Sequence, residues 1–184
     1  MVDTVSGVVV AHAQYVMLCG GEGRLKGRRG RCETIKPLVL PPDRPPDATR
    51  VEATCVNQAV LFRQCGDLNP LHVDERFARE MGFQRPILHG LCCYGYALRH
   101  VMDTYGDGGY AGGGVGDGGD SGGGCGGGGV SLFKSMKVQF SNPVYPGDTL
   151  LTEMWCEGNR VVFQMKVKER GEFVLKGGSV RLNG

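Results

Sequence analysis

The chain has 184 residues and a formal net charge of +2, a length that permits one domain or slightly more. So small a charge gives no argument for a nucleic-acid partner, and no basic stripe is interleaved with aromatic residues. No apolar run approaches the roughly 20 residues that a membrane-spanning helix requires. The N-terminus, where Asp3 precedes a short valine run, is a poor secretory signal.

The eight cysteines are scattered along the chain. None forms a C-x-x-C pair with histidine partners, so no metal site is expected. Cys92 and Cys93 fall in an apolar stretch, where a free cysteine behaves as a small hydrophobic residue. This usage predicts an intracellular, reducing compartment and no structural disulfides.

Residues 1–50 do not have the pattern of an independent domain. Two short apolar runs, 8–11 and 15–18, are candidates for strand fragments. The following glycine- and arginine-rich stretch and the proline pairs after it are typical of a linker. Its basic cluster is interpreted as a solvated segment in preference to a phosphate contact. The main domain is therefore predicted to begin at residue 51.

Two short helices are predicted after this boundary. The first covers 59–65, with Asn57 as its N-cap and Gly66 as its stop. The second follows Asp74, which can cap it, and ends at Gly82.

The third predicted helix, 90–102, is the longest. Its larger apolar residues follow helical spacing, and its opposite side is made of small ones. The larger residues are Leu91, Tyr94, Leu98, Val101 and Met102, and the small ones are Cys92, Cys93, Gly95 and Ala97. Such a helix predicts a sheet wrapped closely around it.

Residues 106–129 contain 16 glycines among 24 residues. A segment of this composition cannot bury enough apolar area to offset its ordering entropy, so a disordered insertion is predicted. A phosphate-cradling loop is not favoured, because the Lys-Ser/Thr ending of such loops is missing.

The C-terminal part alternates apolar and polar residues with the period of a β-strand. Strands are predicted near 131–141, 148–157, 160–169 and 172–182, with tight turns at 158–159 and 170–171. The predicted arrangement is an antiparallel meander. A long helix followed by such a sheet indicates an α+β fold.

The chemistry is concentrated between Asp67 and Gly90. An extended segment would hold the Cα atoms of Asp67 and His72 roughly 16–18 Å apart, but Asn69-Pro70 favours a turn that brings both side chains to one shared water. Gly90 begins the long helix, whose first free N–H groups form a site for negative charge. The combination indicates proton transfer next to a carbonyl.

Each of these residues also has a purely structural interpretation. Asp67 alone is typical of a turn, and His72 alone is typical of a core or surface position. His89, at the start of the helix, is interpreted as a helix cap and is not assigned as a base.

The run GDLNPLHVDERFAREMGFQRPILHGLCCYGYALR resembles the hydratase 2 motif of the MaoC-like hot-dog family. The likeness continues through FKSMKVQFSNPVYPGDTLLTEMWCEGNRVVFQMKV and covers about 46–105 and 130–184. The resemblance implies a hot-dog fold, a long central helix wrapped by a curled antiparallel sheet, as one half of a double hot-dog. The domain at 51–184 would then follow the remnant of a preceding repeat and a linker in 1–50.

The resemblance also implies an activity, a (3R)-hydroxyacyl-CoA dehydratase or 2-enoyl-CoA hydratase 2 of fatty-acid β-oxidation. Asp67 and His72 would hold the water as acid and base, Asn69 would orient water or substrate, and the Gly90 N–H would bind the thioester oxygen. Substrate contacts are expected at Leu68, Pro70, Leu71 and Phe140, although Phe140 also suits a plain core position. No cofactor is expected, since CoA is part of the substrate.

Two other functions stay open, a hot-dog acyl-CoA thioesterase and a truncated, non-catalytic interaction module. The expected partners are an acyl-CoA thioester and a second hot-dog, supplied by a homodimer or another repeat. The expected location is peroxisomal by resemblance, although no targeting signal is visible in the chain.

Overall fold

The computed structural model describes residues 1–15, 38–106 and 133–183. The chain divides into two compact units, Met1–Lys36 and Pro37–Gly184. In residues 1–15 of the first unit, Val2 and Val9 form an isolated bridge where a strand fragment was expected. The expected fragment at 15–18 lies almost wholly outside the described residues, as does the glycine-rich segment 106–129 except for its first residue.

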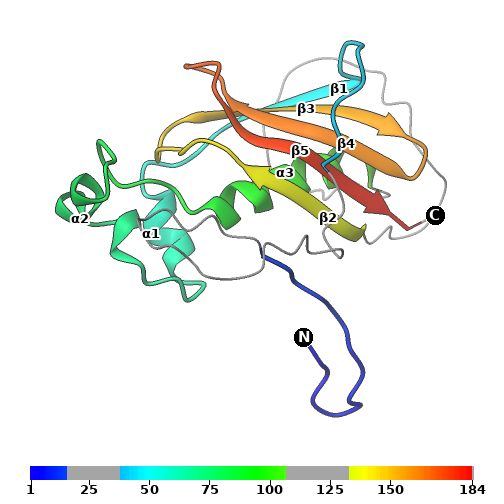
Figure 1. Cartoon of the computed structure of the whole chain (residues 1–184), viewed down its shortest axis with the longest axis horizontal. Coiled ribbons are helices and arrows are strands. Elements are labelled where there is room, and N and C mark those ends of the chain that lie inside the picture. The colour runs from blue at the N-terminus through cyan, green and yellow to red at the C-terminus, as the bar shows by residue number, and fades with distance from the viewer. Residues whose placement is uncertain (16–37, 107–132, 184) are drawn as a thin grey trace, which may run out of the picture. The chain divides into compact units, whose positions relative to one another are not determined.

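The second unit is an antiparallel sheet with one long helix against it (Figure 1). The strands are β1 (Ala48–Ala53), β2 (Phe133–Phe140), β3 (Thr149–Glu157), β4 (Arg160–Val167) and β5 (Phe173–Leu182). The helices are α1 (Gln58–Arg63), the 3₁₀ turn η1 (Pro70–His72), α2 (Glu75–Glu80) and α3 (Gly90–Tyr105). The expected α+β hot-dog arrangement is confirmed.

The sheet order is β1-β3-β4-β5-β2, which corrects the expected four-strand meander. Only β3, β4 and β5 follow one another, joined by tight turns at Gly158 and Gly171, whose φ angles are positive. β2 pairs with β5 instead of β3, at the opposite edge from β1. Alternation of side chains predicts that a segment is a strand but does not determine which strand it pairs with.

The predicted domain boundary at residue 51 falls inside β1. The compact unit begins 14 positions earlier, at Pro37. The preceding residues cover the outer face of the sheet. The Trp155 indole N–H donates to the Arg44 carbonyl at 2.9 Å, and the Asp47 carboxylate accepts the Cys156 N–H at 2.8 Å. The segment from residue 38 to 47 therefore packs as part of the domain, because it shields residues such as Trp155 and Val162 that point away from α3.

The core lies between α3 and the inner face of the sheet. The small side of α3 faces inward, with Cys92, Cys93 and Ala97 buried against strand residues such as Phe163. Of the five larger apolar residues expected on the opposite side, only Val101 is buried, and Leu91 is 46% exposed. Small side chains let the helix approach the sheet closely, so this side of the helix packs against the sheet.

A polar network around the buried His100 connects α3 to β3 and to the edge strand β1. His100 Nδ1 lies 2.8 Å from the Thr152 hydroxyl, and its Nε2 lies 3.1 Å from the Glu52 carboxylate. Glu52 also pairs with Arg99. Burial lowers the pKa of His100 more than Glu52 raises it; Asp103 also raises this pKa, and Arg99 lowers it.

Cysteine pairing only partly follows the expectation. Cys55, Cys65, Cys92 and Cys93 are free thiols. Cys156 is disulfide-bonded, which departs from the predicted absence of disulfides. Among the described residues no helix has the length and apolar character needed to cross a membrane.

Candidate active site

The predicted turn between Asp67 and His72 is present, and local hydrogen bonds explain it. Asp67 Oδ1 accepts the backbone N–H of Asn69 at 3.1 Å, and Asn69 Oδ1 accepts that of Leu71 at 3.1 Å. Pro70 then begins η1, which ends at His72. The Asn69 side-chain oxygen therefore caps η1, and the expectation that Asn69 orients water or substrate stays a prediction.

The orientation and tautomer of His72 are set by one backbone contact. Its Nδ1 lies 2.8 Å from the carbonyl oxygen of Ile87. A carbonyl can only accept, so Nδ1 carries the hydrogen and Nε2 of the neutral ring presents a lone pair. That Nε2 lies 4.0 Å from Asp67 Oδ2, too far for a direct hydrogen bond and suitable for a bridging water.

A third polar side chain, His89, joins this pair. Its ring stacks on His72 with 3.6 Å between centroids, and Phe62 covers it at 4.8 Å. Its Nε2 lies 3.9 Å from Asp67 Oδ2. His89 is only 2% exposed, and within the described parts of the chain neither ring nitrogen has a hydrogen-bond partner. His89 occupies the N-cap position of α3, as expected, but its side chain makes no cap hydrogen bond.

The electrostatics keep His89 uncharged. Burial is the largest influence and lowers its pKa, and His72 acts in the same direction, against the Asp67 carboxylate. At neutral pH the His89 ring of the stacked imidazole pair is therefore neutral.

The three side chains bring their polar atoms close together. Ligand atoms of Asp67, His72 and His89 all lie within 4.8 Å of one another. A water about 2.8 Å from each is compatible with these separations. The same arrangement of two imidazoles and a carboxylate has the composition of a metal site.

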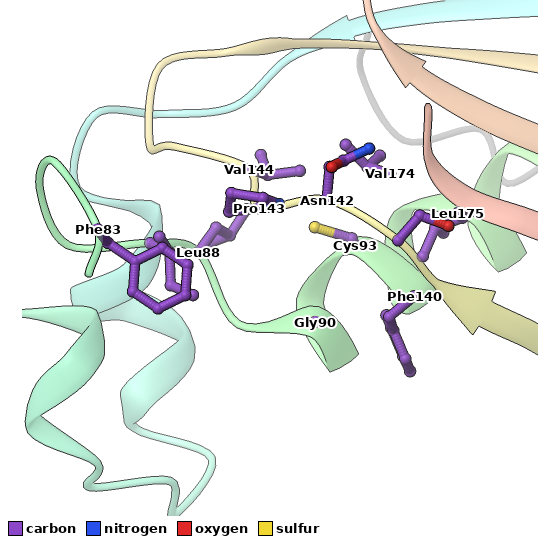
Figure 2. A pocket seen from close by; sticks show the side chains of 12 residues that line it. Phe83, Leu88, Gly90, Cys93, Phe140, Asn142, Pro143, Val144, Val174 and Leu175 are labelled. Carbon is purple, nitrogen blue, oxygen red and sulfur yellow. The ribbon is translucent and has the colours of Figure 1, made fainter. Parts of the chain in front are cut away.

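An apolar cavity of about 300 Å³ adjoins this cluster at the start of α3 (Figure 2). Ile87, Leu88 and Gly90 line it, while His89 between them contacts His72. The Cys92 and Cys93 amides donate to the His89 carbonyl, so Gly90 and Leu91 are the first amides of α3 without an acceptor inside the helix. The segment from Ile87 to Gly90 thus borders both the water site and the cavity.

The other end of the cavity is formed by strand residues. Phe140 at the end of β2 lies over Gly90, and Val174 and Leu175 come from β5 (Figure 2). Phe140 is 48% exposed, so it is not a plain core residue. Leu68, Pro70 and Leu71 do not line the cavity, and their predicted substrate contacts are not tested by it.

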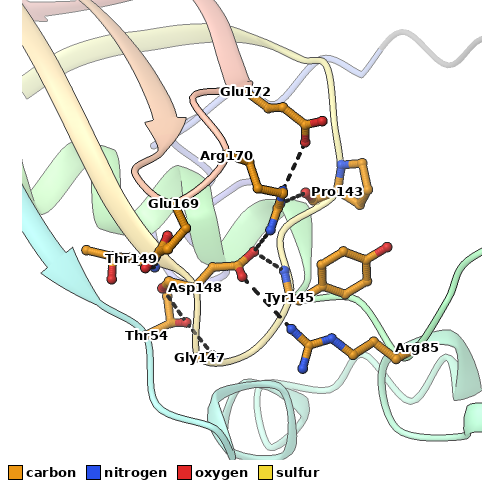
Figure 3. Close-up of polar contacts among 10 residues, drawn as sticks. All are labelled: Thr54, Arg85, Pro143, Tyr145, Gly147, Asp148, Thr149, Glu169, Arg170 and Glu172. Atoms are coloured by element: carbon orange, nitrogen blue, oxygen red, sulfur yellow. Dashed lines mark hydrogen bonds and ion pairs between the residues drawn. The ribbon is translucent and has the colours of Figure 1, made fainter.

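The cavity wall is held by a buried carboxylate (Figure 3). Asp148 Oδ2 accepts Arg170 Nη1 and the Tyr145 N–H, both at 2.8 Å, and Arg170 Nη2 donates to the Pro143 carbonyl at 3.1 Å. The Leu88 N–H donates to the Val144 carbonyl at 2.7 Å. This network positions the loop before β3 and, through Leu88, the segment that carries His89 and Gly90.

The geometry brings together Asp67, His72 and Gly90 as expected and adds His89, which sequence reasoning missed. The available signal was its position beside Gly90, but that position alone is equally typical of a helix cap. The assembled site can hold a water and a developing oxyanion near an apolar cavity.

The chain matches the family model described as a MaoC like domain over residues 38–116 and 123–177. Peroxisomal multifunctional enzyme type 2 of Mus musculus is 43% identical over 95% of this chain and 21% of its own length. Enoyl-CoA hydratase 2, peroxisomal, of Arabidopsis thaliana is 41% identical over 74% of this chain and 38% of its own length. The chain therefore spans less than half of either relative.

A solved structure supports the same assignment. The MaoC-like dehydratase from Phytophthora capsici superposes with a TM-score of 0.71 at 37% identity, over 87% of this chain and 48% of that one. The family model and these matches agree: the chain belongs to the MaoC-like domain family.

Proposed function

We propose that this chain is the catalytic unit of a 2-enoyl-CoA hydratase 2, which adds water reversibly to a trans-2-enoyl-CoA to give a (3R)-3-hydroxyacyl-CoA. The supporting observation is the distance of 4.0 Å between His72 Nε2 and Asp67 Oδ2, which suits a shared water. The stereochemistry follows from the family resemblance.

In the proposed mechanism the thioester oxygen lies against the Gly90 and Leu91 amides. Water bound to Asp67 and His72 adds its oxygen to C3 while electrons move toward the thioester oxygen. Amides at a helix N-terminus stabilise this negative charge. One member of the Asp67/His72 pair accepts the proton of the water, and the site returns a proton to C2. The reaction changes no overall oxidation state, so we propose that it needs no redox cofactor. We also propose that it needs no metal, because the Gly90 and Leu91 amides serve the thioester oxygen.

The apolar cavity beside Gly90 is proposed to receive the part of the acyl chain next to the double bond. Cys93 lines this cavity, but burial raises the pKa of its thiol to about 12. The thiol is therefore protonated at neutral pH and is not an acyl-transfer nucleophile. This observation favours hydration over thioester cleavage by Cys93.

The decisive experiment gives the purified chain a trans-2-enoyl-CoA and follows two signals. Hydration lowers the absorbance of the conjugated enoyl thioester without releasing a free thiol. Release of CoA thiol with unchanged enoyl absorbance would identify a thioesterase instead. The absence of both signals would indicate a non-catalytic module. Chiral analysis of the 3-hydroxyacyl product tests the R configuration.

We also propose that the chain pairs with a second hot-dog, as a homodimer or as a neighbouring repeat of a longer protein. Within the described residues β2 is an edge strand, and Phe133 and Phe140 at its ends are 40% and 48% exposed. Exposed aromatic residues at a strand edge favour pairing. Sedimentation equilibrium at tens of micromolar is expected to show a dimer; a stable monomer with full activity would contradict the proposal.

We propose that this activity serves peroxisomal fatty-acid β-oxidation, and the names of its peroxisomal relatives support this. Microscopy of the natural full-length protein, tagged away from its C-terminus, tests this location. A cytosolic signal would contradict it.

A further inference from the structure

We propose that Asp67, His72 and His89 also form a binding site for one divalent transition-metal ion, with Zn²⁺ as the probe of choice. The ion would occupy the place of the bound water and thereby inhibit the site. Direct metal binding does not depend on the proposed hydratase activity.

The ligand set is the first argument. Two imidazole nitrogens and a carboxylate oxygen, with a fourth position open to water, are a common set for zinc. The ligand atoms lie within 4.8 Å of one another, whereas a tetrahedral ion with bonds of about 2.0–2.2 Å needs them roughly 3.3–3.5 Å apart. Asp67 is 49% exposed, so its carboxylate has room to move, and the stacked His72 and His89 rings must rotate so that one nitrogen of each faces the ion.

The contacts behind the ligands are the second argument. The other nitrogen of a metal-bound histidine usually donates to a carbonyl or carboxylate. His72 already makes this contact, since Nδ1 donates to the Ile87 carbonyl at 2.8 Å and leaves Nε2 as the ligand atom. Asp67 has the equivalent arrangement, because Oδ1 accepts the Asn69 N–H and leaves Oδ2 facing the histidines.

The third argument is the unsatisfied state of His89. Both of its nitrogens are buried and lack a hydrogen-bond partner within the described residues, an uncommon and costly condition for a polar side chain. One of them points toward Asp67, at 3.9 Å. Coordination would give this nitrogen a partner without any change in the burial of the ring.

The test is calorimetric titration of metal-free protein, with any affinity tag removed, using Zn²⁺. One ion is expected to bind per chain. His89→Gln and Asp67→Asn are each expected to weaken binding at least ten-fold, in the range typical of lost metal-site contacts. His12→Gln is the matched control, because it removes an exposed histidine outside the cluster, and it is expected to leave binding unchanged.

Co²⁺ substitution identifies the ligands independently of affinity. The visible spectrum is expected to show d–d bands without a thiolate-to-metal charge-transfer band, and the bands should be lost in Asp67→Asn, whose amide oxygen can still accept the Asn69 N–H that holds the turn. A thiolate band would assign the ion to cysteine and overturn the proposal. Stoichiometric binding with equal affinity in wild type and Asp67→Asn would overturn it as well.

Activity separates this proposal from the preceding one. Inhibition of enoyl-CoA hydration by Zn²⁺, reversed by a chelator, supports both. Zinc binding by a chain without hydratase activity would remove the proposed function and leave the metal site. Hydratase activity in a chain that binds no Zn²⁺ would remove the metal site alone.

Discussion

Gly90→Ala separates the role of Gly90 in the reaction from its role in folding. A Cβ atom at this position would lie 3.1 Å from two ring carbons of Phe140. This is closer than an ordinary contact, but the Phe140 ring is 48% exposed and free to rotate. In the proposed reaction the same methyl group would stand where the thioester oxygen approaches the Gly90 amide.

The cost in stability is expected to be small. Overpacking of a well-packed core costs about 1–3 kcal/mol, and the exposed Phe140 ring reduces this cost. Replacing glycine in a helix also gains up to about 0.5–1 kcal/mol. The free energy of unfolding should therefore change by less than about 1 kcal/mol. The value of kcat/KM for enoyl-CoA should fall roughly 10²–10³-fold, the effect of losing one oxyanion donor.

Urea unfolding and the enoyl absorbance assay measure the two quantities on the same preparation. Gly95→Ala is the matched control, since it lies in the same helix with nothing within 4 Å of the added Cβ, and its activity should equal that of wild type. Adding Phe140→Ala to Gly90→Ala relieves the ring contact and should not restore activity. A wild-type kcat/KM in Gly90→Ala would refute the placement of the thioester oxygen.

Asp67→Asn and His72→Gln should each lower kcat by roughly 10²–10⁴-fold, the range for a positioned acid or base, in a chain that still folds; wild-type turnover would contradict the mechanism. The pKa of His100 is lowered from 6.5 in the folded chain, so the unfolded chain binds its proton first as pH falls, and the stability this provides is present above about pH 6.5 and lost below it. Urea unfolding at pH 7.5 and 5.5 should therefore show a smaller loss in His100→Gln than in wild type, and parallel losses would be inconsistent with a neutral buried ring. Gly178→Ala places a Cβ 2.5 Å from the fully buried ring of Phe163 and should cost about 1–3 kcal/mol in the free energy of unfolding, while a cost near zero would show that the ring can move.

The sequence alone predicted the local structure: the turn, the helix cap and the strands. The turn from Asp67 to His72 is made by the short side chain of Asn69 and the ring of Pro70, which act within a few residues of their own positions. Asp74 caps α2 for the same reason, accepting the Phe77 N–H at 3.0 Å. Strand alternation placed β3, β4 and β5 within a few residues of their observed ends, because the side-chain period is a property of each strand by itself.

Contacts between distant segments were decided only by the tertiary structure. β2 pairs with β5, and residues 38–47 cover the sheet; both contacts join segments that are far apart in the chain. The stacking of His89 on His72 has the same origin, since the two residues are 17 positions apart in the chain. The Ile87 carbonyl holds the His72 ring beside the start of α3, where His89 lies. A histidine before a glycine at a helix start gives no local sign of such a partner, so its place beside the carboxylate appears only once the helix has packed on the sheet.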